Sequence, residues 1–262
     1  MSSDIPPRRA GAPWKVGTVP YLVARPLTWG LAQHPEVELV EAPPARLAQM
    51  LRQGELDVAL ASSVLALEEP PLPMWEEGPV IACDGPIRSV LLFLRPGLED
   101  PKSLKNWAAD PHSRTGQRLT RWLLEHAWDL QEAEAVDLEA GVDPFALKVD
   151  AVQLIGDPAL DAVHQHPDWT VVDLGTAWKE ATDLPFVFAG WMARPDFDRS
   201  GLAPILQQAA VDGLPQRAAM AVEAAGGDRE EERFLQRYLL EDLRYGLDSS
   251  TIRICLERLR DG

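Results

Sequence analysis

The sequence has little of what marks several protein classes. Its 262 residues include two cysteines, Cys83 and Cys255, which lie far apart and fit no C-x-x-C or zinc spacing. We expect both to be buried small hydrophobic side chains, and we predict no redox or metal site. No segment approaches the roughly 18 uninterrupted apolar residues of a membrane span, and residues 1–13 contain no apolar run of signal-peptide length. The sequence therefore predicts a cytoplasmic protein without a membrane span.

Basic residues are also scarce. Lysine and arginine number 25 against 41 aspartates and glutamates, which gives a formal net charge of -16. This balance argues against nucleic acid as a partner, because its phosphates require a basic face. An anionic ligand would have to be held by local donors that overcome this field, such as helix N-termini. A few arginines are further candidates for that role: Arg25, Arg88, Arg114 and Arg118.

The composition is otherwise that of a globular protein, with 46% hydrophobic and 25% charged residues. The first half alternates short apolar runs with amphipathic stretches. These predict strands at 15–19, 37–41, 57–61, 80–83 and 89–94, with helices near 24–34 and 44–53. Such alternation is typical of a parallel sheet with crossover helices, so we expect an α/β fold.

A second α/β pattern follows a Pro-Gly pair at residues 96–97. It predicts a helix at 115–128, strands at 149–155, 169–174 and 184–191, and C-terminal helices at 202–224, 229–245 and 249–260. The simplest arrangement has residues 13–95 and 193–262 in one domain, with residues 96–192 inserted as a second. Two crossing strands would form a hinge, and a cleft between the domains would hold a small ligand.

Polar side chains gather where predicted strands end or helices begin. Ser62 and Ser63 follow the strand at 57–61 and could bind an anion, or could cap the turn that comes next. Ser113, Thr115 and Gly116 open the helix at 115–128, where hydroxyl and N–H groups make an anion site. Simple N-capping explains the same residues, so both interpretations stay open.

Six segments of residues 14–192 together resemble the chorismate dehydratases of the futalosine route to menaquinone. In order they are Tyr21-Leu22-x-x-Arg25-Pro26-Leu27, Gly54-x-Leu56-Asp57-Val58-Ala59-Leu60-x-Ser62-Ser63, Gly85-Pro86-Ile87-Arg88-Ser89-Val90, Ser113-x-Thr115, Ile155-Gly156-Asp157-Pro158-Ala159-Leu160 and the stretch from Asp173-Leu174-Gly175 through Trp178 and Thr182 to Leu184-Pro185-Phe186-Val187-Phe188-Ala189-x-Trp191. Each segment alone is weakly specific, and their shared order carries the resemblance.

The resemblance implies a type II periplasmic-binding-protein-like fold, with two α/β domains, a hinge and an interdomain cleft. It also implies a cytosolic lyase that removes water from chorismate to give 3-[(1-carboxyvinyl)oxy]benzoate. The family uses no metal or organic cofactor, and the substrate's own carboxylate is expected to take the ring proton. The sequence indicates no oligomeric state.

By the same resemblance Ser89 is the candidate catalytic residue, because it matches the serine of the family's Gly-x-x-x-Ser-Val segment. It would donate a hydrogen bond to a substrate carboxylate or to the leaving oxygen. A serine that merely starts a buried strand is the alternative. Arg88 is a candidate carboxylate ligand, and Asp157 could orient a substrate hydroxyl or simply form an Asp-Pro turn.

One residue departs from the family pattern. The family usually has Asn directly after the Tyr-Leu pair, and this chain has Val23, which can neither donate nor accept a hydrogen bond. Val23 favours a second hypothesis, a solute-binding or sensor protein for a small carboxylate. A third is the related enzyme that cleaves a futalosine derivative, but its opening Ser-Pro-Cys-Pro-Asn-Asp type motif is absent here.

Overall fold

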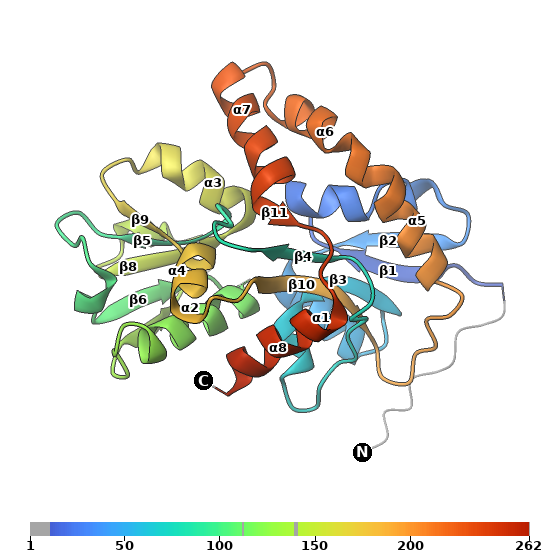
Figure 1. Cartoon of the computed structure of the whole chain (residues 1–262), viewed down its shortest axis with the longest axis horizontal. Helices are drawn as coiled ribbons and strands as arrows, with labels where there is room; N and C mark the ends of the chain where they lie inside the picture. The colour runs from blue at the N-terminus through green and yellow to red at the C-terminus, as the bar shows by residue number, and fades with distance from the viewer. Residues whose placement is uncertain (1–10, 112, 139–140, 262) are drawn as a thin grey trace.

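Two β-sheets, each covered by helices, form two lobes of the chain in the computed structural model, which describes residues 11–111, 113–138 and 141–261. Figure 1 shows the lobes side by side. The larger sheet has the order β11-β4-β10-β3-β1-β2, and the smaller has the order β7-β6-β8-β5-β9. The α/β architecture with two lobes agrees with the expectation from the sequence.

The strands of the larger sheet are β1 (Trp14–Thr18), β2 (Val37–Glu41), β3 (Val58–Ser62), β4 (Val80–Cys83), β10 (Phe186–Ala193) and β11 (Leu243–Arg244). Those of the smaller sheet are β5 (Val90–Leu94), β6 (Asn106–Ala109), β7 (Glu134–Asp137), β8 (Ala151–Ile155) and β9 (Thr170–Asp173). Strand β1 pairs in parallel with β2 and β3, whereas β10 runs antiparallel to β3 and β4. The larger sheet is therefore mixed, with its parallel part where helices alternate with strands.

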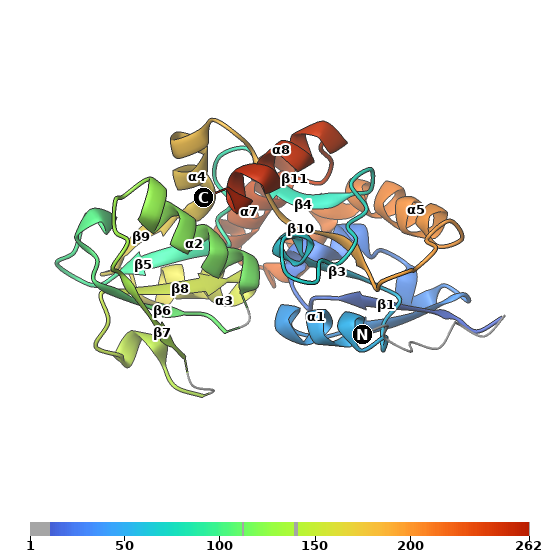
Figure 2. The same ribbon diagram turned by 90° about the horizontal axis from the view of Figure 1, so that it is seen from below.

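The α-helices are α1 (Pro44–Arg52), α2 (Arg114–His126), α3 (Gly156–Gln165), α4 (Leu174–Thr182), α5 (Ala203–Gly213), α6 (Arg217–Ala224), α7 (Arg229–Arg237) and α8 (Ser249–Arg260). Figures 1 and 2 place α7 and α8 where the two lobes meet. In the described part of the chain, no helix has the length and apolar character needed to cross a bilayer.

Several expected helices differ from those observed. The segment near 24–34 forms two short 3-10 turns, Leu22–Leu27 and Leu31–Gln33, because Pro26 lies inside it and Gly30 has a positive φ. The expected helix at 202–224 is divided by a 3-10 turn at Leu214–Gln216. The helix expected over 229–245 ends at Arg237 and continues as a π-helical turn, Tyr238–Asp242. Strands β6 and β7 and helices α3 and α4 were not predicted.

Strand pairing shows where the chain passes between the sheets. β5 was expected to end the first domain at residue 95, but it pairs antiparallel with β8 and β9 of the smaller sheet. β10 was expected in the inserted part, but it lies in the larger sheet between β3 and β4. We therefore propose residues 84–89 and 183–185 as the two crossing segments, in place of boundaries near 95 and 192. An apolar run such as β5 fits either sheet, so its residues alone do not decide its partner.

Candidate active site

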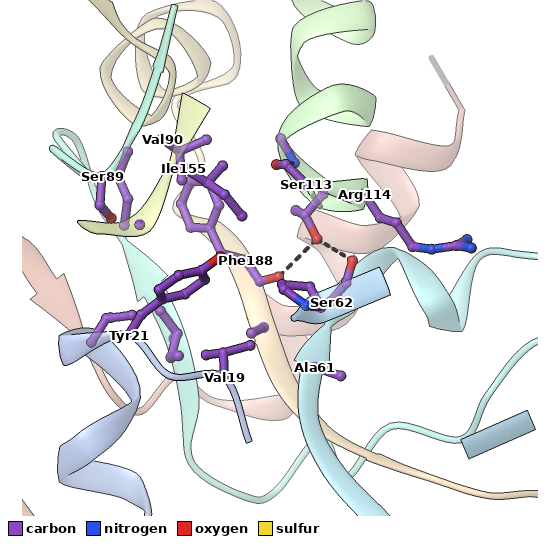
Figure 3. A pocket seen from close by; sticks show the side chains of 18 of the residues that line it. Val19, Tyr21, Ala61, Ser62, Ser89, Val90, Ser113, Arg114, Ile155 and Phe188 are labelled. Atoms are coloured by element: carbon purple, nitrogen blue, oxygen red, sulfur yellow. Dashed lines mark hydrogen bonds between the residues drawn. The ribbon is translucent and has the colours of Figure 1, made fainter. Parts of the chain in front are cut away.

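A cleft with about 620 Å³ of empty space, part of it open to solvent, lies between the two sheets. Its walls come from both lobes and are mostly apolar, with a few polar side chains set among them (Figure 3). The polar or ionisable residues in the lining are Tyr21, Ser62, Ser89, Ser113, Arg114 and Thr115.

Two hydroxyls meet across the lobes at one end of this cleft. Ser62 ends β3, and its Oγ lies 2.5 Å from Oγ1 of Thr115 in the first turn of α2. Thr115 donates its proton to the carbonyl oxygen of Phe188 in β10, at 3.0 Å. The Ser62 hydroxyl is therefore the donor to Thr115. This chain of hydrogen bonds, drawn in Figure 3, ties α2 of one lobe to two strands of the other.

The N-terminus of α2 approaches the cleft with its backbone. Ser113 is the N-cap, and its Oγ accepts hydrogen bonds from the Gly116 N–H at 3.1 Å and the Gln153 amide at 3.3 Å. A Cβ on Gly116 would clash with Ser113 Oγ and lie 2.6 Å from that amide nitrogen, so a larger residue here would displace the two side chains that cap the turn. The dipole of the 13-residue helix favours an anion here by about 0.3–1 kcal/mol.

Ser89 is held in the cleft wall by the first crossing segment. Two backbone N–H groups of this segment, at Ile87 and Arg88, donate to the carboxylate of Asp173 at 3.1 and 2.7 Å. Arg88 adopts a left-handed conformation with φ 61°, and its guanidinium pairs with Asp242. The resulting sharp turn presents the next residue, Ser89, to the cleft.

The structure brings together five of the eight residues that strand ends, helix starts and the family resemblance single out. These are Ser62, Ser89, Ser113, Thr115 and Gly116, all of which line the cleft. Ser63 does not, because its fully buried hydroxyl donates to the Val187 carbonyl at 2.6 Å. The Arg88 guanidinium is engaged outside the lining by Asp242.

Asp157 likewise lies outside the lining and connects the lobes. Its Oδ1 accepts a hydrogen bond from the Leu22 N–H at 3.4 Å, at the start of the first 3-10 turn. Burial raises the pKa of the Asp157 carboxyl, and the neighbouring charge of Asp161 adds to this, while the hydrogen bond from Leu22 acts the other way. Asp157 thus links α3 to the lobe of the larger sheet through a partly buried hydrogen bond.

Sequence reasoning missed one polar residue of the cleft, Tyr21, and named another, Arg114, as one of four arginines that could hold an anion. Tyr21 belongs to a matched segment, and burial, followed by the charges of Asp110 and Asp157, raises its pKa to about 12, so its hydroxyl is neutral near pH 7. The Arg114 side chain extends away from the cleft in Figure 3 and forms an ion pair with Glu68.

The charges around the cleft are unusual for a site that would hold an anion. Within the described part of the chain, the lining contains no aspartate, glutamate or histidine, and Arg114 is its one basic residue. Hydroxyls and the N-terminal turn of α2 therefore supply the polar groups at its surface. Such a site can orient an anion, but its lining side chains offer no ordinary base near neutral pH.

Comparisons with known proteins agree with this architecture. A sequence model of the family described as "Menaquinone biosynthesis" matches residues 14–260. The chorismate dehydratase of Thermus thermophilus is 30% identical over 230 residues, which cover 80% of this chain and 81% of that protein.

Solved structures resemble the chain at the level of fold. A Candida albicans protein with the generic periplasmic binding protein fold has a TM-score of 0.61 and 15% identity, covering 95% of this chain and 89% of that one. An Archaeoglobus fulgidus protein has a TM-score of 0.58 and 14% identity, covering 97% of each chain. The aliphatic sulphonate binding protein of Escherichia coli has a TM-score of 0.51 and 16% identity, covering 95% and 79%. The expected periplasmic-binding-protein-like fold is confirmed.

The raised pKa of Asp157 predicts a pH-dependent effect of Asp157→Asn. A carboxyl whose pKa is raised on folding stabilises the protein while it is protonated, and this contribution is lost as the pH rises from its unfolded pKa, about 3.9, through its folded pKa. Asparagine keeps an acceptor for Leu22 without the charge. The variant should therefore have a higher unfolding midpoint than the wild type at pH 7.

Below about pH 3 this difference in unfolding midpoint should vanish, because the Asp157 carboxyl is then protonated in both the folded and the unfolded protein. Thermal unfolding of both proteins across this pH range checks the prediction, with the exposed Asp168→Asn as the control. A midpoint difference that does not vary with pH would show that the Asp157 charge has no such cost.

Proposed function

The chain belongs to the menaquinone biosynthesis family, and we propose that it is a chorismate dehydratase, a carbon–oxygen lyase that eliminates water from chorismate. The observation that carries this proposal is the convergence of the matched segments on one cleft. Ser62, Ser89 and Thr115 come from three such segments, separated in the chain and lying in different lobes, and all line it. A site for one small molecule, made from both lobes, explains that convergence.

The proposed reaction needs positioning more than reactive protein groups. One ring C–H bond breaks and its electron pair forms the new double bond, while the neighbouring C–O bond breaks and the hydroxyl leaves. Proton and hydroxyl depart as water, and the ring of 3-[(1-carboxyvinyl)oxy]benzoate is aromatic. Because aromatisation makes the elimination favourable, the cleft has to fix the pose and exclude competing losses. The elimination is redox-neutral and consumes no cofactor.

We propose that the substrate carboxylates are held mainly by the backbone at the N-terminal turn of α2. The Ser62 and Thr115 hydroxyl protons are already used within the protein, and their hydrogen bonds fix the first turn of α2. At that turn a carboxylate would meet backbone N–H groups and the positive end of the helix. Arg114, the basic residue of the lining, is already paired with Glu68. Neutral donors bind a dianion without bringing in a fixed charge that would itself need a partner.

The proton acceptor in this proposal is a carboxylate of the substrate. Support comes from the described lining, which offers no carboxylate or imidazole, and from Tyr21, whose pKa of about 12 keeps its hydroxyl neutral. Ser89 would donate a hydrogen bond to the departing hydroxyl as the C–O bond breaks. The reaction then returns Ser89 unchanged.

Val23 lines the same cleft and brings no polar group to it. The sequence contains one asparagine, Asn106, and this residue begins β6 and accepts a hydrogen bond from the Asp150 N–H, so it is no substitute for the family amide. We propose that the neutral hydroxyl of Tyr21, two residues before Val23, takes over the polar contact. A cytoplasmic location is part of the same proposal.

A catalytic amount of the purified protein should convert many equivalents of chorismate to a product lighter by one water. Mass spectrometry of the mixture, against an enzyme-free control, identifies that product. Recovery of unchanged chorismate from folded protein would contradict the lyase proposal and favour a solute-binding or sensor protein.

Alanine substitutions at Ser89 and Ser63 distinguish a catalytic role from a packing role, because each serine makes one buried hydrogen bond. Ser89→Ala should lower kcat more than about tenfold, and should also cost about 1–3 kcal/mol of stability because the Tyr238 hydroxyl loses its acceptor. Ser63→Ala removes the hydrogen bond to Val187, which lies outside the cleft, at a similar cost in stability.

Ser63→Ala should therefore keep the wild-type kcat but unfold at a lower denaturant concentration than the wild type. Steady-state kinetics and chemical unfolding of the three proteins check both statements. Equal losses of kcat in the two variants would assign Ser89 a packing role only.

A further inference from the structure

Ser89 has a buried hydrogen-bond partner that comes from the far end of the chain. Tyr238 lies in the π-helical turn after α7 and is 1% exposed, and its hydroxyl donates to Ser89 Oγ at 2.8 Å. The two residues are separated by 149 positions in the sequence. Tyr238 is absent from the lining of the cleft, so it stands behind Ser89.

The hydrogen bond runs from the Tyr238 hydroxyl to Ser89 Oγ, and the burial of the phenol keeps the donated proton on Tyr238. Burial raises the pKa of Tyr238 well above its ordinary value; the hydrogen bond to Ser89 lowers it by less than burial raises it, and the charges of Asp157, Asp173 and Asp242 raise it further. Tyr238 is thus neutral, and its single hydroxyl proton is committed to Ser89. Within the described residues, the Ser89 hydroxyl proton has no acceptor, and Ser89 lines the cleft.

The same π-helical turn also binds Arg88, the residue directly before Ser89. Asp242, four residues after Tyr238, pairs with the Arg88 guanidinium, and both side chains are largely buried. The ring of Phe234 lies under that guanidinium, 5.8 Å from ring centroid to Cζ. One C-terminal turn therefore holds two consecutive residues of the first crossing segment. π-Helical turns are rare and occur often at functional sites.

We propose that Tyr238 is a positioning residue for the dehydration. Its hydrogen bond turns the Ser89 hydroxyl proton into the cleft. It also stabilises the negative charge that grows on Ser89 Oγ as Ser89 hydrogen-bonds the departing hydroxyl. This inference rests on the proposed function. Tyr238 neither gains nor loses a proton, since a tyrosinate at this site would be buried among three carboxylates. Its contribution is to polarise Ser89 through a second hydrogen bond in series.

Tyr238→Phe removes one oxygen atom and keeps the buried ring. With chorismate as substrate, we expect kcat to fall about tenfold, the equivalent of one hydrogen bond, while KM changes little. In a Ser89→Ala background the same substitution should cause no further loss of kcat. It should also restore stability to that background, because it removes the hydroxyl that Ser89→Ala leaves unpaired.

Tyr245→Phe is the matched control. Tyr245 is also buried, and its hydroxyl donates to the Val23 carbonyl at 3.1 Å without touching Ser89. Whatever Tyr245→Phe does to kcat or stability should be the same in the wild-type and Ser89→Ala backgrounds.

Independent losses of kcat from Tyr238→Phe and Ser89→Ala, or an undiminished kcat in Tyr238→Phe, would overturn the positioning role while leaving the lyase intact. A wild-type protein that does not consume chorismate would overturn the proposed function and this inference together. If Tyr238→Phe does not fold, 3-fluorotyrosine at position 238 keeps the ring and hydroxyl but donates more strongly. It must then change kcat in the wild type and not in Ser89→Ala.

Discussion

The Asp173 carboxylate holds the first crossing between the lobes, and the geometry of the cleft depends on it. It accepts the N–H groups of Ile87 and Arg88 and also caps α4 through the Thr176 N–H at 2.9 Å. Three backbone donors on one carboxylate fix the turn that presents Ser89. The pair Arg88–Asp242 closes the turn from the other side. The crossing segment is thus a rigid support for one hydroxyl.

The second constraint is electrostatic. A chain with a net charge of -16 would repel a dianion, and the described lining of its cleft contains no acidic side chain that would add to this locally. The one lining arginine is paired with Glu68, so the proposed binding relies on the N-terminus of α2, which the Ser62–Thr115 hydrogen bond holds at the cleft. An absence of strong acids, bases and free cations suits a reaction in which the substrate carries its own base.

The sequence predicted the α/β class, most strands and five of the lining residues, because hydrophobic periodicity and polar residues at strand ends are local signals. It could not separate Ser62 from Ser63, since two adjacent hydroxyls after a buried strand look alike until their partners, Thr115 and Val187, are placed. It could not assign β5 to a sheet, because a fully buried run fits both. Nor could it connect Tyr238 to Ser89, because no local pattern links residues 149 positions apart.

The pH dependence of kcat with chorismate tests the central claim that the protein supplies no base. In the account, a substrate carboxylate takes the ring proton, and the pKa of Tyr21 in the lining, about 12, lies above the pH range tested. The kcat should therefore be constant from about pH 6 to 9 wherever the fold is intact. A limb that rises with a pKa between about 6 and 8 would show that a protein group must lose a proton, and would contradict the account.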